Sequence, residues 1–166
     1  VETSLQPHAF IGNASNVIIK GLIIEKYANP AQTGAIFGDG TSDWTIEDSE
    51  VRYNHGTGIR LGNGMSILRN RVHNNGQLGI GGSGSNVLLQ DNEIARNNYA
   101  GYYYYWEAGG TKFFQTVRLI ARRNYLHDNA GPGLWTDIEN QQTLYEFNVT
   151  SNNRVAGIFH ERSFDA

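Results

Sequence analysis

A short pattern that recurs five times along this chain constrains its fold more than any other feature. In each copy a glycine precedes an apolar residue, and four copies carry an apolar anchor eight positions before that residue. Successive anchor positions are separated by 21, 22, 32 and 24 residues, a period that indicates a solenoid. The pairs are Gly58-Ile59, Gly79-Ile80, Gly101-Tyr102, Gly133-Leu134 and Gly157-Ile158, and the anchor positions are Val51, Val72, Ile94, Leu126 and Thr150.

The residue types within the repeat decide which solenoid to expect. A leucine-rich repeat needs a leucine ladder and a helical return, whereas these units are rich in β-branched residues and show almost no helical periodicity. We therefore predict an all-β chain folded as a right-handed parallel β-helix, with residues 1–166 forming a single domain. Successive coils of such a fold lie about 4.8 Å apart, so equivalent residues form columns.

Strand alternation predicts which columns face the core. We expect two strands in each coil, one after the repeated glycine and one before the anchor. The first inward set is Ile59/Leu61, Ile80/Gly82, Tyr102/Tyr104, Leu134/Thr136 and Ile158/His160, and the second is Trp44/Ile46, Met65/Ile67, Val87/Leu89, Leu119/Ala121 and Thr143/Tyr145.

Asparagine recurs in two further columns, where the chain bends between strands. An amide both donates and accepts, so stacked asparagines can bond to the coils above and below. We expect structural ladders here and assign these residues no catalytic role. The columns are Ser49, Asn70, Asn92, Asn124 and Asn148, and Asn54, Asn75, Asn97, Asn129 and Asn153.

Composition and charge exclude several function classes. The net charge of −3 and the lack of a long basic stretch argue against a nucleic-acid partner. No run reaches the roughly 18 apolar residues of a membrane helix, so no membrane partner is expected. The chain begins at Val1 without a signal-peptide pattern, which predicts a mature or trimmed polypeptide. With no cysteine, it has neither disulfides nor a cysteine metal site.

Neither end of the predicted solenoid carries an obvious cap. End coils expose unpaired strand edges and an apolar cross-section. The final residues, 163–166, follow a strand closely and contain no amphipathic helix. We therefore expect either a fragment of a longer β-helix or self-association through the open ends.

The outward columns combine aromatic rings with carboxylates. Rings pack against the faces of sugars and carboxylates accept hydroxyl hydrogen bonds, so the pattern predicts a glycan-binding groove with a polysaccharide partner. The first outward position holds Arg60, Gly81, Tyr103, Trp135 and Phe159, the second holds Gly62, Ser83, Tyr105, Asp137 and Glu161, and the third adds Glu107 and Glu139.

Asp137 and Glu161 are the predicted catalytic pair. Neighbours in one column lie one rung apart, which would place these carboxyls about 5 to 7 Å from each other, close to the separation used in glycoside hydrolysis. One carboxyl could stay protonated as the acid while the other acts as base or nucleophile. The alternative is a solvated acidic ridge without chemistry.

The third unit contains an expansion from Tyr102 to Lys112. Long insertions on a scaffold often carry function. We expect the Gly109-Gly110 pair to turn the chain so that Lys112 returns toward Glu107, as an ion pair or as a cation for the substrate. The alternative is a loop held by buried aromatic residues.

The histidines and one acidic segment complete the candidates. His160, at a formally inward position, is either a core histidine or a general acid/base, and His73 and His127 are expected to be surface residues at a turn. The segment 39–43 with Asp48 offers oxygen ligands but lacks the spacing of a calcium loop. No cofactor is expected, with Ca²⁺ as the alternative.

Three motifs in this chain resemble secreted bacterial right-handed parallel β-helix repeat proteins of the pectate-lyase-like superfamily. The resemblance covers most of the chain from about Val17 onward. It implies an extracellular protein acting on a polysaccharide, since the superfamily includes pectate lyases, polygalacturonases, alginate lyases and mannuronan epimerases. The motifs are the segments 106–112, 131–140 and 157–161.

The reaction stays open between hydrolase, lyase and epimerase. Only Trp135-Thr136-Asp137 echoes a polygalacturonase motif, and the arginine base of pectate lyases has no counterpart here. A uronate polymer would be repelled by the predicted carboxylates unless Ca²⁺, Lys112, Arg60 or Arg162 compensated, which favours a neutral glycan.

Three functions therefore remain. The first is an enzyme in which Asp137 and Glu161 act with Glu107, His160 and Lys112, while the remaining positions bind substrate. The second is a noncatalytic glycan-binding or scaffold solenoid, and the third is a fragment whose function lies in other coils. The predicted substrate-binding residues are Trp135, Tyr103, Tyr105, Phe159, Arg60, Glu139 and Arg162.

Overall fold

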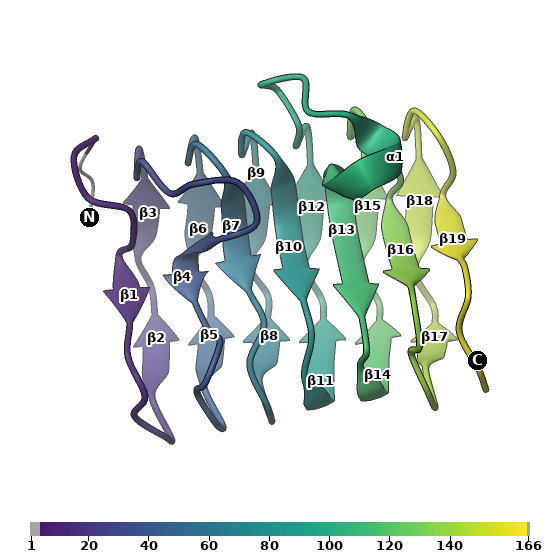
Figure 1. The fold of residues 1–166 in the computed structure, drawn as a ribbon, viewed down its shortest axis with the longest axis horizontal. Coiled ribbons are helices and arrows are strands. Elements are labelled where there is room, and N and C mark those ends of the chain that lie inside the picture. The colour runs from purple at the N-terminus through teal and green to yellow at the C-terminus, as the bar shows by residue number, and fades with distance from the viewer. Residues whose placement is uncertain (1–3, 166) are drawn as a thin grey trace.

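The computed structural model describes residues 4–165 as a stack of coils in which three parallel sheets run along the solenoid axis (Figure 1). All pairings between strands are parallel, as a β-helix requires. The predicted all-β solenoid is confirmed. Val1 and Ala166, at the predicted trimmed start and uncapped end, lie outside the described residues. Within that range no helix is long and apolar enough to cross a membrane.

Each coil contributes strands to three sheets, whereas two strands per coil were predicted. The extra strand contains the anchor residues, which form a sheet of their own. We call the sheets front, lower and upper, as they appear in Figure 1. The front sheet contains β1 (Phe10–Ile11), β4 (Gly34–Phe37), β7 (Thr57–Arg60), β10 (Leu78–Gly82), β13 (Gly109–Phe114), β16 (Leu134–Asp137) and β19 (Ile158–His160). The lower sheet contains β2 (Ile18–Lys20), β5 (Thr45–Glu47), β8 (Ser66–Leu68), β11 (Ser85–Gln90), β14 (Val117–Arg122) and β17 (Leu144–Glu146), and the upper sheet contains β3 (Ile23–Glu25), β6 (Glu50–Arg52), β9 (Arg71–His73), β12 (Glu93–Ala95), β15 (Tyr125–His127) and β18 (Val149–Ser151).

The apolar columns fill the interior of the coils. Ile59 and Ile80 pair directly across β7 and β10, and both are fully buried. Burial of such side chains contributes about 1.5–3 kcal/mol each to folding. The predicted core columns are confirmed in every coil except the third unit, where a different segment forms the strand.

The asparagine ladders are confirmed. The main-chain and side-chain amides of Asn75 both donate to Asn97 Oδ1, at 3.0 and 3.1 Å, and Asn75 Nδ2 also donates to the Val51 carbonyl at 3.1 Å. Asn97 repeats this arrangement with Asn129. Each rung therefore satisfies buried backbone groups at a bend, where no strand partner is present.

The register of the third unit differs from the prediction. Ile80 pairs with Thr111, and Gly82 pairs with Phe113, so Gly110 occupies the position expected of Gly101. The expansion precedes the front strand instead of following it. The interval between the repeated glycine and the next core strand explains the choice: it is 7 residues to Met65, 8 to Val87 and 10 to Thr143, whereas Gly101 lies 18 residues from Leu119 and Gly110 only 9.

As a consequence, residues 98–108 rise from the coil and form the single helical turn α1 (Tyr104–Glu107) above the front sheet (Figure 1). Tyr102 and Tyr104 do not line the core, contrary to the prediction, because Thr111 and Phe113 occupy those positions. The Gly109-Gly110 pair is not a turn; it begins strand β13.

The end coils present edge strands on both sides of the stack. β1 and β19 are the outermost strands of the front sheet. Apolar side chains are exposed on these coils, among them Ile11 and Ile18 at one end and Leu144, Val149 and Ile158 at the other. Self-association through these ends stays a prediction.

Candidate functional site

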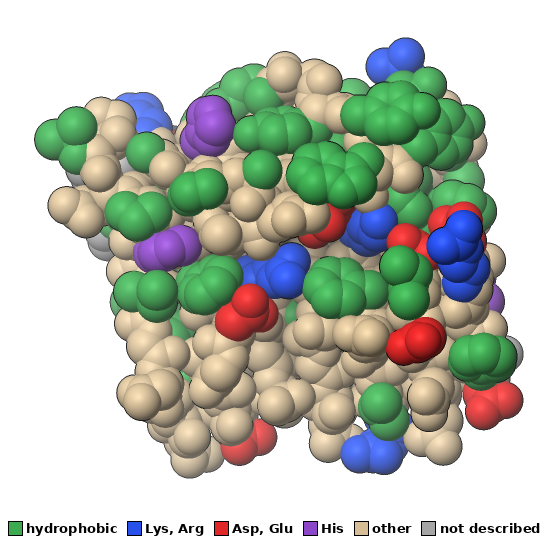
Figure 2. All heavy atoms as spheres, in the orientation of Figure 1, with side chains coloured by type: hydrophobic (Ala, Val, Ile, Leu, Met, Phe, Trp, Pro, Cys, Tyr) green, Lys and Arg blue, Asp and Glu red, His purple; other side chains and the backbone are tan. Residues whose placement is uncertain are grey.

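A depression of about 380 Å³ lies between α1 and the outer face of the front sheet. In the space-filling view, hydrophobic side chains gather on the upper part of this face and charged side chains cross its middle (Figure 2). The combination of apolar walls with a few charged groups is typical of ligand sites. The depression is lined by Tyr105, Trp106, Glu107, Lys112, Phe114, Asp137 and Ile138.

Lys112 and Asp137 form the ionic centre of this depression. Strand alternation points both side chains outward from adjacent strands, and Lys112 Nζ lies 3.1 Å from Asp137 Oδ2. The ammonium group also donates to the Trp106 carbonyl of α1 and lies 4.1 Å from the centroid of the Trp135 ring. Lys112 therefore joins the insertion to the sheet and holds the Asp137 carboxylate in place.

Glu107 lies at the other side of the depression and does not pair with Lys112, contrary to the prediction. Its Oε2 accepts a hydrogen bond from Gln32 Nε2 at 2.7 Å, and its Oε1 lies 3.5 Å from Arg60 Nη1. The residue is 5% exposed, and among the described residues Oε1 has no hydrogen-bond partner. A buried carboxylate oxygen without a donor is costly, so the site contains an unused acceptor.

Two glutamines fasten the insertion to the coils. Gln77 Nε2 donates to the Glu107 carbonyl at 2.8 Å, while Gln77 Oε1 accepts from the Gln32 main-chain amide at 2.6 Å. With the Gln32–Glu107 hydrogen bond, these contacts tie the end of α1 to two different coils. The position of Glu107 is thus set by long-range contacts rather than by the helical turn itself.

Arg60 reaches Glu107 because the next coil carries glycines at Gly81 and Gly82. A Cβ atom at Gly82 would lie 3.0 Å from Arg60 Cδ and Nε, and Gly82 has a φ of +120° that side-chain-bearing residues rarely adopt. The guanidinium group crosses this gap and packs 5.1 Å from the centroid of the Phe114 ring, one coil further on.

Trp135 is not the exposed sugar platform that was predicted. It is 2% exposed, covered by Lys112 and stacked on Phe159 with centroids 5.5 Å apart. Its role at this site is to support the Lys112 ammonium group from below. Exposed rings come instead from the insertion: Tyr103, Tyr105 and Trp106 are 65%, 57% and 47% exposed.

Of these three rings, Tyr105 and Trp106 line the depression. The neighbouring Tyr104 ring packs against the Arg154 guanidinium at 4.5 Å, which connects the insertion to the last coil. The predicted outward positions of Tyr103 and Tyr105 on the front strand are wrong, because Lys112 and Phe114 take those places in the register.

Asp137 and Glu161 stand in the same column. Thr136 pairs with His160, and the Glu161 main-chain amide donates to the Thr136 carbonyl at 2.8 Å, so the two carboxyl residues are neighbours on successive coils. Asp137 Oδ1 accepts from the Ile138 amide at 2.8 Å, and Oδ2 pairs with Lys112. Their joint action as acid and base stays a prediction.

The other predicted residues lie apart from this centre. His160 points inward, where its Nδ1 lies 2.7 Å from Thr136 Oγ1, which also bonds to the Tyr145 hydroxyl. Burial raises the pKa of Tyr145 to about 12. Glu139 is exposed and accepts from Gln115 at 3.1 Å, and its main-chain amide donates to the carbonyl of the exposed Arg162.

His73 and His127 are not surface turn residues, contrary to the prediction. They lie in strands of the upper sheet and are 6% and 7% exposed. Their Nε2 atoms lie 2.7 Å from Glu50 Oε1 and 3.2 Å from Glu93 Oε1, respectively. Both histidines therefore belong to a ladder of charged groups along the upper sheet.

The acidic segment considered for calcium is spread out. Asp39 Oδ1 lies 3.4 Å from Arg60 Nε, while Asp48 pairs with Lys20 and Arg69. Across residues 4–165, no group of three or more histidine, aspartate or glutamate side chains is arranged to hold a metal ion.

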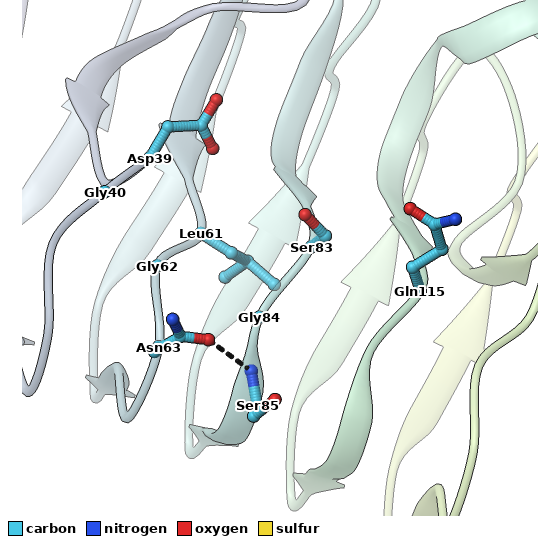
Figure 3. Close-up of a pocket in the computed structure, with 9 residues that line it drawn as sticks. All are labelled: Asp39, Gly40, Leu61, Gly62, Asn63, Ser83, Gly84, Ser85 and Gln115. Atoms are coloured by element: carbon cyan, nitrogen blue, oxygen red, sulfur yellow. Dashed lines mark hydrogen bonds between the residues drawn. The ribbon is translucent and has the colours of Figure 1, made fainter.

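A second depression of about 390 Å³ lies at the corner between the front and lower sheets. Figure 3 shows its lining, which comes from four successive coils. The floor contains Gly62 and Gly84, where a Cβ would lie 2.3 Å from the Gly38 carbonyl oxygen and 2.6 Å from that of Gly62. These glycines allow the coils to approach closely and leave the corner hollow. The polar lining is Asp39, Asn63, Ser83, Ser85 and Gln115.

Several site residues were missed from the sequence. Trp106, Phe114 and Ile138 line the first depression, and Gln32 and Gln77 position Glu107. The glycine-to-strand interval would have placed Phe114 correctly in an outward column. Nothing in the repeat indicates the two glutamines, because their partner belongs to the insertion.

The comparisons with known proteins support the fold. The family described as the right-handed beta helix region matches residues 34–166, which is most of the chain. Neither the search of curated proteins nor the search of solved structures returned a match.

Proposed function

Because the chain belongs to the right-handed β-helix family, we propose that it is a carbohydrate-active protein that binds a polysaccharide on the outer face of its front sheet and acts on it there. The family establishes the solenoid, and the proposal about polysaccharide rests on the chemistry of the first depression.

The observation that carries the proposal is the Lys112–Asp137 pair beneath an aromatic roof. The 3.1 Å pair opens onto a depression walled by Tyr105 and Trp106, with the Glu107 carboxylate opposite. Exposed rings can pack on sugar faces, and fixed charged groups can hydrogen-bond to hydroxyls. The mixture suits a ligand that is apolar on its faces and polar at its edges, as a sugar ring is.

For chemistry, we assign Asp137 and Glu161 to the reacting positions. In hydrolysis, one carboxyl would give its proton to the glycosidic oxygen as the bond to the anomeric carbon breaks. The other would take a proton from the water that bonds to that carbon. Lys112 would orient Asp137, and Glu107 would hold a substrate hydroxyl. Elimination by a lyase uses the same site without added water.

A second candidate function is noncatalytic glycan binding. It is favoured by the ion pairing of both carboxylates in the depression, Asp137 with Lys112 and Glu107 with Arg60. A carboxylate held by a cation is a good hydrogen-bond acceptor but is less free to move a proton.

Incubation with a panel of polysaccharides, read by mass spectrometry, tests both candidates. Hydrolysis adds water to the products, elimination leaves an unsaturated sugar, and epimerisation leaves the mass unchanged. We expect new products that disappear in Asp137→Asn and Glu161→Gln, with folding of each variant checked by circular dichroism. Binding without products favours the second candidate, and turnover that survives both substitutions contradicts the assigned pair.

The proposal also includes location and partners. A protein that acts on a polysaccharide meets its polymer outside the cell, so we propose a secreted, extracellular bacterial protein. The net charge of −3 is consistent with a partner other than nucleic acid. The assigned roles need no metal ion.

A further inference from the structure

The two depressions on this side of the molecule adjoin each other. Phe114 lines the first and Gln115 lines the second, and these residues are consecutive at the end of β13. Arg60 stands at the boundary, with Nη1 3.5 Å from Glu107 in the first depression and Nε 3.4 Å from Asp39 in the second. We infer that one uncharged glycan chain occupies both depressions and crosses Arg60. This inference rests on the proposed function.

The second depression has the chemistry of a hydroxyl-binding surface. Apart from Asp39, its polar side chains are the uncharged amides and hydroxyls of Asn63, Ser83, Ser85 and Gln115. Such groups both donate and accept, as sugar hydroxyls do. No lysine or arginine is among the lining residues, so an anionic group would find only Asp39 as a charged neighbour there.

The first depression has balanced charge. Lys112 offsets Asp137, and Arg60 offsets Glu107. The repulsion of a uronate expected from the sequence is therefore largely removed, and charge alone does not choose the ligand.

The unused atom makes the choice. Glu107 Oε1 is buried and, among the described residues, lacks a hydrogen-bond donor. A sugar hydroxyl supplies a donor to this oxygen, whereas the carboxylate of a uronate brings another acceptor. The open acceptor thus favours a neutral sugar in the first depression, in agreement with the uncharged lining of the second.

Calorimetric titration with oligosaccharides of increasing length tests this inference. One series should be neutral and the other built of uronates, with matched lengths. We expect the affinity for the neutral series to rise about tenfold at the length that reaches the second depression, since one or two added hydrogen bonds are worth about that factor. The uronate series should bind at least tenfold more weakly.

Two variants make the test specific. Ser83→Leu fills the second depression and should reduce the affinity for long neutral oligosaccharides to that for short ones. The matched control is Ser66→Leu on β8 of the lower sheet, outside both depressions, which should leave every affinity unchanged. Glu107→Gln should weaken the neutral series about tenfold, with thermal unfolding recorded to verify folding.

The outcomes separate this inference from the proposed function. Affinity that does not depend on length, or tighter binding of the uronate series, overturns the inference and leaves the proposed function intact. If no oligosaccharide or polysaccharide binds, both are overturned. A length-dependent gain that Ser83→Leu abolishes and Ser66→Leu preserves supports the inference.

Discussion

The ammonium group of Lys112 lies 3.1 Å from the carboxylate of Asp137 on the next coil, and both side chains are about nine-tenths buried. This pair joins the insertion, the front sheet and the candidate site. It exists because Gly110, rather than Gly101, begins the front strand of its coil, which places Lys112 in the outward column beside Asp137.

The first prediction concerns the stability of this pair. Lys112→Met and Asp137→Asn should each lower the free energy of unfolding by about 3 kcal/mol, because each leaves a buried charge without its partner. The double variant Lys112→Met/Asp137→Leu should lose much less than the sum. Urea unfolding of the four proteins measures the coupling. Single losses below about 1 kcal/mol that simply add would mean that the pair behaves as an exposed one.

The second prediction concerns the asparagine ladder. Asn97→Ala removes an acceptor used by two amides of Asn75 and two donated hydrogen bonds, so unfolding should become easier by about 3 kcal/mol. Asn153→Ala is the matched control at the last rung, where the residue is only partly buried and water can replace the lost contacts. Its effect should be less than half as large. Equal losses in chemical denaturation would contradict the ladder as the source of stability.

The third prediction concerns Gly82. Alanine there would meet both an unfavourable φ and the Arg60 side chain at 3.0 Å, so it should cost about 2 kcal/mol and displace Arg60 from Glu107. Gly101→Ala isolates the backbone effect, because Gly101 has a φ of +76° and open space where its Cβ would lie. That control should cost about 1 kcal/mol. Thermal unfolding of both variants measures the difference, and an equal loss would show that Arg60 yields freely.

The fourth prediction concerns pH. Burial opposes ionisation of Glu50, but hydrogen bonds from His73 and Arg52 outweigh it and hold the pKa of Glu50 below its ordinary value of 4.5. A lowered pKa in the folded state stabilises the protein above the ordinary value, and that contribution is lost as pH falls below it. Glu50→Gln should therefore flatten the decline of stability below about pH 4.5, and Arg52→Met should flatten it in part. Urea midpoints between pH 3 and pH 7, about the range spanned by the titration, test this; parallel curves for all three proteins would contradict it.

Much of the fold was predictable because a column repeats one environment many times. Val51, Val72 and Ile94 carry the same apolar character at the same position, and Asn75 and Asn97 the same amide, so each coil supports the interpretation of the next. The third strand of each coil was missed because its inward residue is a single anchor, too short a segment to show strand alternation.

The candidate site was less predictable because it is built where the repeat is interrupted. The spacing of Gly101 from Asn97 matches the other coils, and only the distance onward to Leu119 shows that the strand begins later. Asp137 was identified as a site residue from its column, whereas its pairing with Lys112 depended on that shifted start.

The sequence by itself determined a parallel β-helix, its core columns and its asparagine ladders, because these follow from short-range periodicity that every coil repeats. Only the tertiary structure decided which cation meets which carboxylate, that Trp135 is covered, and that Glu107 keeps an oxygen without a donor. Those features depend on how one non-repeating segment packs across several coils, and contacts of that kind have no period from which they could be predicted.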